Sequence, residues 1–250
     1  MDIRASNKEI GGHKFGQLGY GKDMIDENGS VTFAQADEGD VYYNGAAVAT
    51  MPLQTAAAAI ELISDSAEDD VGGTGATLVI VAGLDGDYKA VSERLIMDGV
   101  VAVVGTQLFM RVLGVIALAA GTNETNVGNI DCQAVGGGQI WDRIVAGEGA
   151  NQHSLITVPA GKEFWLSHWV FTSSALTAQT FKVLARPYGG AWYIVTKRYA
   201  YFGGSVDDSV PFLESQSFPE KCDIKMNATV GAAASISSHM FGVLTTTQKG

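Results

Sequence analysis

The segment Ala76–Ala82, ATLVIVA, followed by Gly83–Asp87, GLDGD, decides how this chain folds. A short run rich in β-branched residues is typical of a buried strand. The Asp-Gly pair in the turn is among the strongest short signals of a β-hairpin. Residues Tyr88–Met97 then return as the partner strand, with alternate residues from Val91 onward on one face. The sequence therefore predicts an antiparallel hairpin at 76–97.

The same pattern of short apolar runs and turns continues on both sides of this hairpin. Asp98-Gly99 predicts a second hairpin leading into Val100–Val104, and further strands follow at intervals of about ten residues. No segment of ten or more residues has a helical period. This spacing favours an all-β fold with two β-sandwich or jelly-roll-like units. The glycine run Gly136–Gly138 predicts the boundary between a first β domain at 58–135 and a second β-sandwich domain at 136–250.

Residues 1–57 differ from the rest of the chain. Glycines interrupt the first part, and polar residues dominate from Lys22 to Asp40, so this segment cannot bury enough apolar surface to offset its ordering entropy. We therefore expect an extended N-terminal arm that becomes ordered by lying across a neighbouring subunit, with a flexible leader as the alternative. The residues expected to contact the partner are His13, Lys14, Phe15, Leu18 and Tyr20.

The composition narrows the possible functions. The chain of 250 residues has 27 acidic and 16 basic residues, a formal charge of −11, and nucleic-acid binding would need clustered Lys and Arg. Charged residues make up only 17%, and there are 31 glycines, a composition that favours extensive protein–protein contacts over a highly solvated enzyme. The nearest approach to a basic cluster is interpreted as a set of solvated strand positions: Lys182, Arg186, Lys197 and Arg198.

The most apolar part of the chain, Val100–Gly121, is interpreted as a set of short buried strands. Gln107 and Arg111 lie in its middle, and a central Arg costs about 2.5–3.5 kcal/mol in a membrane-spanning helix. We therefore expect no membrane partner. The polar N-terminus does not resemble a signal peptide. Cys132 and Cys222 are expected to be buried free thiols, although the sequence leaves open whether they lie close together.

No group of residues matches a catalytic, cofactor or metal site. The four histidines lack the spacing of zinc ligands. Gly72–Gly75 lacks the Gly-Lys-Ser/Thr ending of a phosphate-binding loop. The acidic loops at 65–70 and 85–87 lack the alternating pattern of an EF-hand, and solvated loops are the simpler interpretation. We therefore expect a protein that is not an enzyme and needs neither a cofactor nor a metal.

Aromatic residues are concentrated in the last hundred residues. Aromatic side chains at alternating strand positions usually belong to a core or a subunit interface, but exposed ones can stack on carbohydrate. The candidates for an interface or for glycan contact are Trp165, Trp169, Trp192 and Tyr193.

Several segments resemble structural proteins of tailed-phage virions from marine and environmental sources. The first is Ser66–Gly99, in which a strand, a Gly-Leu-Asp turn and a returning strand that begins with Tyr follow one another. Thr157–Lys162, TVPAGK, resembles a turn before an aromatic strand in phage virion β domains, and Arg186–Gly189 and Phe218–Lys221 continue the likeness. The resemblance implies a component of the phage particle, assembled in the host cytoplasm.

Three functions follow from these observations. The first is a capsid decoration, cement or head-fibre-base subunit, expected as a homotrimer bound to the major capsid protein. The second is a tail or neck component, including a spike that binds the host. The third is a polysaccharide-degrading enzyme, which would need two carboxylates about 5–10 Å apart in a groove.

Overall fold

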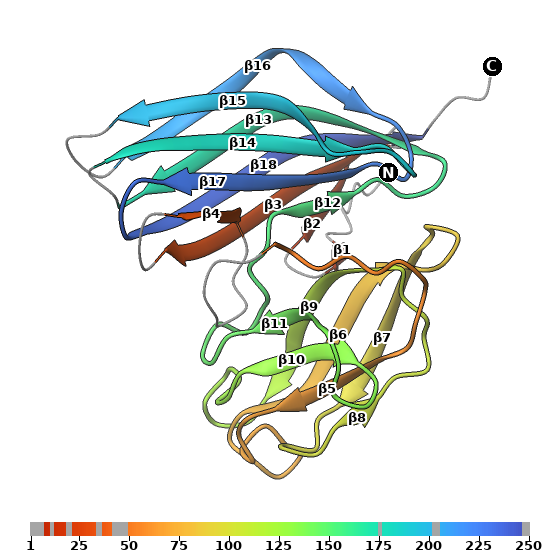
Figure 1. The fold of residues 1–250 in the computed structure, drawn as a ribbon. Coiled ribbons are helices and arrows are strands. Elements are labelled where there is room, and N and C mark those ends of the chain that lie inside the picture. The colour runs from red at the N-terminus through yellow and green to blue at the C-terminus, as the bar shows by residue number, and fades with distance from the viewer. Residues whose placement is uncertain are drawn as a thin grey trace. The chain divides into compact units, whose positions relative to one another are not determined.

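The fold is known from a computed structural model, which describes residues 8–10, 13–18, 22–33, 37–41, 50–174, 177–201 and 206–246. These residues form antiparallel β-strands and no helix, so the all-β prediction is confirmed. The chain divides into two compact units. Unit 2 is essentially residues 51–152, and unit 1 combines most of residues 1–50 with residues 153–250 (Figure 1).

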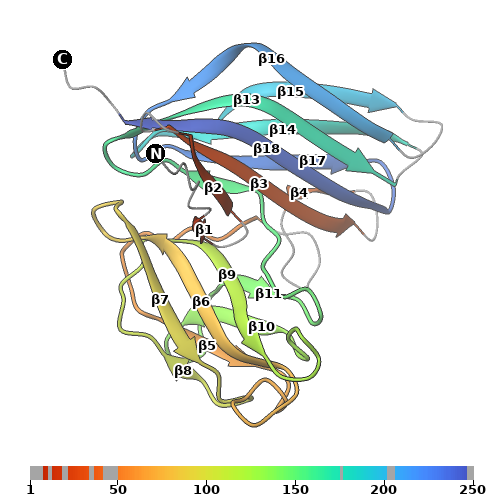
Figure 2. The same cartoon turned by 180° about the vertical axis from the view of Figure 1, so that it is seen from behind.

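Unit 2 is a sandwich of two sheets. One sheet has the strand order β11-β10-β5-β8, and the other has the order β7-β6-β9 (Figure 2). Its buried core is mostly aliphatic and draws on both sheets, with Ile60, Leu62 and Ile130 from the first and Val79 and Val81 from the second. The strands of unit 2 are β5 (Ile60–Ser64), β6 (Ala76–Leu84), β7 (Ala90–Ile96), β8 (Val103–Val104), β9 (Arg111–Ala120), β10 (Ile130–Ala134) and β11 (Ile140–Ile144).

The hairpin predicted at 76–97 is present as β6 and β7, which pair from Leu78↔Ile96 to Leu84↔Ala90. The carboxylate of Asp85 accepts hydrogen bonds from the backbone N–H groups of Asp87 and Lys89, which holds the turn closed. The second predicted hairpin is wrong in its pairing. Residues 98–101 do form a turn, but β8 pairs with β5 in the opposite sheet and not with β7.

The glycine run Gly136–Gly138 lies in the turn between β10 and β11, which pair with each other in one sheet. Gly136 and Gly137 have φ values of 89° and 77°, a backbone region that favours glycine. Unit 2 ends at Gln152 and unit 1 resumes at His153, whereas we expected the second domain to begin at residue 136.

Unit 1 is a second sandwich. One sheet has the order β1-β2-β3-β18-β13-β16, and the other has the order β12-β17-β14-β15 with β4 also paired to β17. The strands are β1 (Lys8–Ile10), β2 (His13–Leu18), β3 (Lys22–Phe33), β4 (Asp37–Asp40), β12 (Leu155–Thr157), β13 (Lys162–Ser173), β14 (Ala178–Arg186), β15 (Tyr193–Tyr201), β16 (Val206–Phe218), β17 (Asp223–Val230) and β18 (Ala234–Thr246).

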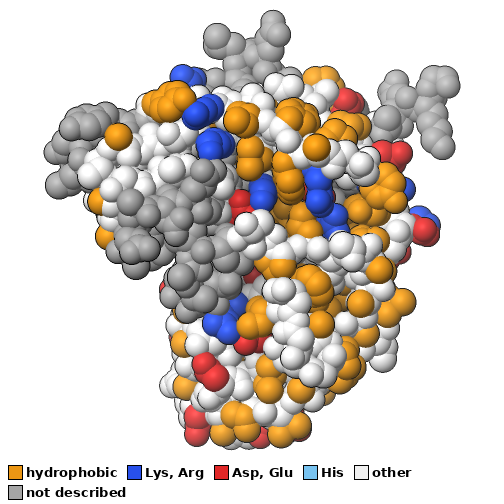
Figure 3. Space-filling view, in the orientation of Figure 1, with side chains coloured by type: hydrophobic (Ala, Val, Ile, Leu, Met, Phe, Trp, Pro, Cys, Tyr) orange, Lys and Arg blue, Asp and Glu red, His pale blue; other side chains and the backbone are white. Residues whose placement is uncertain are grey.

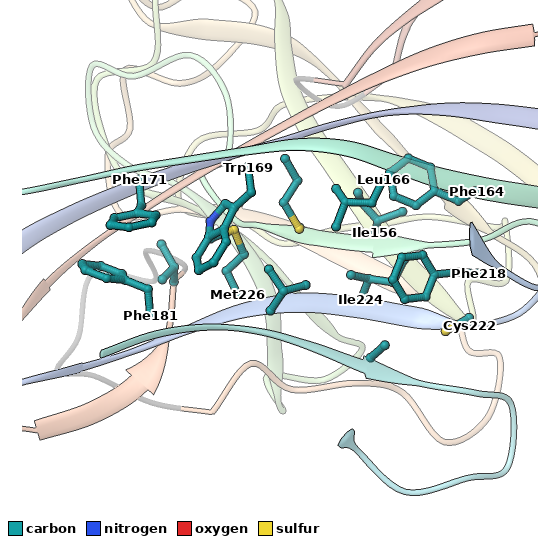
Figure 4. Packing of buried hydrophobic residues seen from close by; sticks show 14 of the residues in the cluster. Ile156, Phe164, Leu166, Trp169, Phe171, Phe181, Phe218, Cys222, Ile224 and Met226 are labelled. Atoms are coloured by element: carbon teal, nitrogen blue, oxygen red, sulfur yellow. The ribbon is translucent and has the colours of Figure 1, made fainter. Parts of the chain in front are cut away.

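The core of unit 1 is built around aromatic side chains. Phe171 of one sheet stacks on Phe181 of the other, with ring centroids 4.1 Å apart (Figure 4). Trp169 lies beside Phe171 with centroids 4.9 Å apart, and Phe164 stacks on Phe218. All five rings have no exposed surface. The Phe171–Phe181 pair crosses between the two sheets, while the other two ring contacts lie within the sheet that contains β13.

The N-terminal region supplies strands to unit 1. β3 pairs with β18 over twelve residue pairs, from Lys22↔Thr245 to Phe33↔Ala234. β4 pairs with the C-terminal half of β17, while β12 pairs with its N-terminal half. Both the N–H and the hydroxyl of Ser154 donate hydrogen bonds to the carbonyl of Val41. Val41, which follows β4, and Ser154, which precedes β12, therefore lie directly beside each other.

Candidate interaction surfaces

The aromatic residues singled out in the sequence lie in different places. Trp169 is in the core of unit 1, where its indole N–H donates to the hydroxyl of Ser238. Trp165 lies in β13 and is 37% exposed. Trp192 and Tyr193 lie at the start of β15, in the other sheet of the sandwich. Trp169 therefore has the core role that the sequence left open, and the four side chains do not form one surface.

The residues predicted for a partner-contacting arm fall mostly in a strand. His13, Lys14, Phe15 and Leu18 belong to β2, which pairs with β3 through Gly16↔Met24 and its neighbours. Tyr20 lies outside the described residues. Contact between these residues and a neighbouring subunit stays a prediction.

The outward side of the sheet β12-β17-β14-β15 in unit 1 carries a group of basic and aromatic side chains. Lys182 of β14 and Lys197 of β15 lie directly opposite each other in the ladder. Their neighbours Phe181 and Val183 point into the core, so the two lysines point outward. Like charges at directly opposed positions destabilise a sheet. We expected these lysines to be separate solvated positions on their strands. A bulge after Val183 shifts the register of the hairpin, so the sequence alone does not show that the two residues pair.

Two further cations on this side are paired with buried acids. Arg186 lies 2.6 Å from Asp223, and Lys225 lies 2.5 Å from Asp40. The Trp192 ring packs against both cations, with the Arg186 guanidinium 4.9 Å and the Lys225 ammonium 4.5 Å from its centroid. Cation–π contacts of this kind stabilise a positive charge where water is partly excluded. These pairs fix the positions of the cations and of Trp192.

The exposed part of this side lies along β15. Tyr199 is 76% exposed, and the Lys197 ammonium lies 4.5 Å from the centroid of its ring. Next to Tyr199, a hollow of about 460 Å³ is lined by Thr180, Thr229 and neighbouring residues. Figure 3 shows Lys and Arg side chains among hydrophobic ones on this side of unit 1. We call Lys182, Arg186, Trp192, Lys197 and Tyr199 the basic face.

The sheet β7-β6-β9 of unit 2 has an apolar outward side. Leu78 and Ile80 of β6 point away from the core residues Val79 and Val81, and Ile96 pairs with Leu78. Ile116 of β9 pairs with Ile80 from the other side. Ile96 is 62% exposed, and the other three side chains are partly exposed. We call Leu78, Ile80, Ile96 and Ile116 the apolar face; Arg94 is the charged residue beside it, opposite Ile80.

Three loops at one end of unit 2 bring acidic residues together. Residues 65–70 and 98–99 meet through the bridge between Asp70 and Asp98, and the 121–124 loop joins them because the Asn123 N–H donates to the carbonyl of Thr74. The exposed or half-exposed carboxylates here are Asp65, Glu68, Asp70, Asp98 and Glu124, which we call the acidic end. Among the described residues, none of these five carboxylates lies within ion-pair distance of a Lys or Arg.

The acidic end is organised by the buried carboxylate of Asp69. It accepts hydrogen bonds from the Ser64 hydroxyl and from the backbone N–H groups of Ala76, Val127 and Gly128. Four donors from three parts of the chain satisfy both oxygens, so this carboxylate holds the loops in place.

Two glutamates hold other loops of unit 2 in the same way. The Glu61 carboxylate accepts from the N–H groups of Gly136 and Gly137 and from Gln133, and the Gly136 bond above all lowers the pKa of Glu61. Burial tends to raise the pKa of Glu93, but hydrogen bonds from Thr106 and Gln107 outweigh it and lower that pKa. These acids therefore have structural roles.

The two cysteines lie in separate cores, Cys132 in unit 2 and Cys222 in unit 1, and both are free. Burial raises the pKa of the Cys132 thiol well above its usual range and that of Cys222 to about 11. Both thiols are therefore protonated and unreactive at neutral pH. Within the described part of the chain, no three His, Cys, Asp or Glu side chains are grouped as metal ligands would be. That part also contains no helix long and apolar enough to cross a membrane.

No protein-family model matches the chain, and no curated protein matches it significantly. Solved structures with weak similarity include the infectious bursal disease virus Gx strain, at 11% identity and a TM-score of 0.25, covering 100% of this chain and 80% of that one. The VP2 subviral particle of the same virus gives 10% identity and a TM-score of 0.20, covering 92% of this chain and 78% of that one. Similarity this low carries no inference about the function of this chain.

Proposed function

We propose that this protein is a non-enzymatic structural subunit of a phage particle, a decoration or cement protein that binds the shell. The observation that carries this proposal is the apolar face of unit 2. It brings together one exposed and three partly exposed aliphatic side chains from three neighbouring strands, and contiguous exposed apolar surface of this kind marks protein–protein contact sites.

The partner proposed for the apolar face is the major capsid protein. A two-fold contact between two copies of the chain would place the same face on both sides. It would then place the Arg94 side chains of both copies, each opposite Ile80, in one interface to which the apolar face contributes no acidic residue. Like charges brought together in an interface cost free energy, and this favours a different protein as the partner.

The resemblance to tailed-phage virion proteins supports the proposal that the particle is that of a phage. Two of the segments that carry it contain tight turns: residues 85–89 join β6 to β7, and Pro159–Gly161 lies between β12 and β13. Gly161 has a φ of 74°, and its N–H is held by the carboxylate of Glu220. The turn before the aromatic strand β13 is therefore fixed by side-chain contacts as well as by its Pro and Gly.

The buried acidic residues of both units favour a structural role over glycoside hydrolysis. Asp142 accepts from Asn151 and the Arg143 N–H, Asp223 from Thr157 and Arg186, and Asp40 from Lys225. Together with Asp69 and Glu61, each has its oxygens bound to groups of the same chain. General acid–base catalysis needs a carboxyl within hydrogen-bond reach of a substrate.

The experiment is to locate the chain in purified phage particles by mass spectrometry and by reconstruction of the particle. Many copies on the shell are the expected result; a few copies at the tail or neck, or none at all, would overturn the cement role.

A variant then tests the apolar face. Ile96→Lys should leave the fold intact but reduce the amount of chain bound to particles. The matched control is Val135→Lys, because Val135 is 50% exposed in the β10–β11 turn, away from this face. Equal incorporation of the two variants would contradict the proposed contact.

A further inference from the structure

We propose that the basic face of unit 1 binds the acidic end of unit 2 of a second copy of the chain. This deepens the proposed function by naming one contact through which copies assemble. It rests on the proposed function in one respect: a structural subunit of a particle is expected to meet other copies of itself.

The distribution of charge along the chain is strongly uneven. Residues 51–152 contain four Lys or Arg and thirteen Asp or Glu, a formal charge of −9. Residues 153–250 contain eight Lys or Arg and six Asp or Glu, a formal charge of +2. Residues 1–50, nearly all of which belong to unit 1, contain four Lys or Arg and eight Asp or Glu, so unit 1 as a whole has a formal charge of −2 against −9 for unit 2. The acidic excess therefore lies mainly in unit 2, while half of all the basic residues lie in the segment that forms the basic face.

The basic face is built to receive a negative charge. Lys182 and Lys197 lie directly opposite each other, so two positive charges are presented at one place on the sheet. Lys197 is exposed, and no carboxylate of the described residues lies within ion-pair distance of its ammonium. Arg186 and Trp192 are already held by Asp223 and by cation–π contact, so the face is ordered before it binds. Pre-ordered side chains lose less entropy on binding.

The acidic end supplies charge of the opposite sign on an equally fixed support. Glu68 is anchored by the Thr74 N–H and hydroxyl, and Asp65 is anchored by Asn129. Asp69 fixes the loops beneath them. Carboxylates held in place and unpaired with cations of their own unit offer complementary charge to Lys182 and Lys197 of another copy.

A contact between two different surfaces of the same chain is heterologous. Such contacts close into a ring when the rotation between copies allows it, and otherwise they continue as an open array. A cyclic trimer, which we expected from the sequence, is one of the closed forms.

The test uses two charge-reversed forms of the full chain. The first, Lys182→Glu/Lys197→Glu, reverses the basic face. The second, Glu68→Lys/Asp98→Lys, reverses the acidic end. Matched controls reverse exposed charges elsewhere in unit 2: Lys89→Glu in the β6–β7 turn and Glu148→Lys after β11. Protection of the Cys132 and Cys222 thiols from alkylation verifies that each unit is folded.

Self-association is measured by sedimentation over a concentration series from micromolar to millimolar, at low and high salt. The unmodified chain should associate more weakly at high salt, and each reversed form should weaken association about tenfold or more. An equimolar mixture of the two forms should associate again, as should a chain that carries all four substitutions. The control variants should behave like the unmodified chain.

Several results would overturn the proposal. They are a chain that stays monomeric over the whole series, association unchanged by either reversal, or no recovery in the mixture. Binding of dextran sulfate or single-stranded DNA that depends on Lys182 and Lys197, without association between copies, would instead assign the face to a polyanionic ligand. Because the apolar face is tested separately with Ile96→Lys on particles, failure of the charge contact is distinguishable from failure of the structural role.

Discussion

The two sandwiches of this chain are stabilised in different ways. Unit 1 has strands of up to 13 residues and a core of stacked aromatic rings, with Phe171 on Phe181 and Phe164 on Phe218. Unit 2 has strands of at most 10 residues, an aliphatic core, and loops held by the buried or half-buried carboxylates of Asp69, Glu61 and Glu93. In unit 1, long rows of backbone hydrogen bonds hold the strands in register. In unit 2 the strands are shorter, and hydrogen bonds from carboxylates to the loops help to hold them in place.

Each unit contains one buried thiol, and this makes the comparison measurable. Cys222 lies in the core of unit 1 and Cys132 in that of unit 2. Alkylation of either thiol requires its own unit to open, so the two labelling rates report the stability of the two units separately.

The largest effect is expected from the aromatic core of unit 1. Trp169→Ala should cost about 3–5 kcal/mol, because it removes a fully buried side chain and leaves a cavity between the sheets. Labelling of Cys222 should accelerate, while labelling of Cys132 should change much less. The control is Trp165→Ala in the same strand, where 37% exposure predicts a smaller loss. Equal acceleration at both cysteines would show that the units unfold together.

A smaller loss, of about 3 kcal/mol, is expected for Asp69→Ala in unit 2. The substitution leaves the N–H groups of Ala76 and Gly128 without their acceptor in a buried site. Labelling of Cys132 should accelerate while that of Cys222 stays constant. Asp87→Ala, in an exposed turn, is the control. Should Asp69→Ala leave Cys132 protected, the carboxylate would not be what holds these loops.

The pH dependence of unit 2 should differ from that of unit 1 by a modest amount. The folded pKa of Glu61 lies below its ordinary value of 4.5, so the carboxylate contributes stability at pH values above that. This contribution is lost as the pH falls through the lowered folded pKa, because the unfolded state binds the proton first. Because alkylation needs the thiolate, the rate at each pH is divided by that of the urea-unfolded chain at the same pH. This ratio should rise for Cys132 as the medium is acidified below pH 4.5, and Glu61→Gln should flatten the dependence. An unchanged slope in the variant would rule out Glu61 as the cause.

The smallest expected effect is that of a chelator. The Asp69 oxygens are bound to four donors of the chain itself, and the acidic loops lack an EF-hand pattern. EDTA should therefore leave the melting temperature of both units unchanged. A clear fall in the melting of unit 2 alone would mean that its acidic end holds a divalent cation.

Local patterns in the sequence predicted the local parts of this fold. The Asp-Gly turn and the alternation from Val91 onward were sufficient for the β6–β7 hairpin, because turn chemistry and side-chain period act over a few residues. The pairing of β8 with β5 was not predicted, because it joins Glu61 to Val104 and the sequence favoured the nearer strand. The pairing of β3 with β18 joins residues more than two hundred positions apart, and no local pattern specifies such a contact.

The candidate surfaces also depend on contacts between residues that are distant in the sequence. Trp169 is buried because its side of β13 packs on the other sheet. Tyr193 is 46% exposed although it lies opposite the buried Ala185, because it is at the start of an edge strand. The stretch at 100–121 was expected to form short buried strands. It contains β8 and β9, but the expected burial is wrong for five of its side chains, which are 45–56% exposed: Val100, Val101, Val104, Leu108 and Leu118. The face that β9 helps to form also requires Ile96 and Ile80 from other strands. Lys182 and Lys197 became neighbours only through a bulged hairpin.

The hydrogen bonds from Ser154 to Val41 have a consequence for how such a protein changes over evolution. Because β4 and β12 lie end to end along β17, the chain leaves unit 1 and returns to it at one place. A short connection from Val41 to Ser154 would preserve the strand order of unit 1. Unit 2 lies in the sequence between these neighbouring segments, so its loss, lengthening or exchange for another domain would not require the sandwich of unit 1 to be rebuilt.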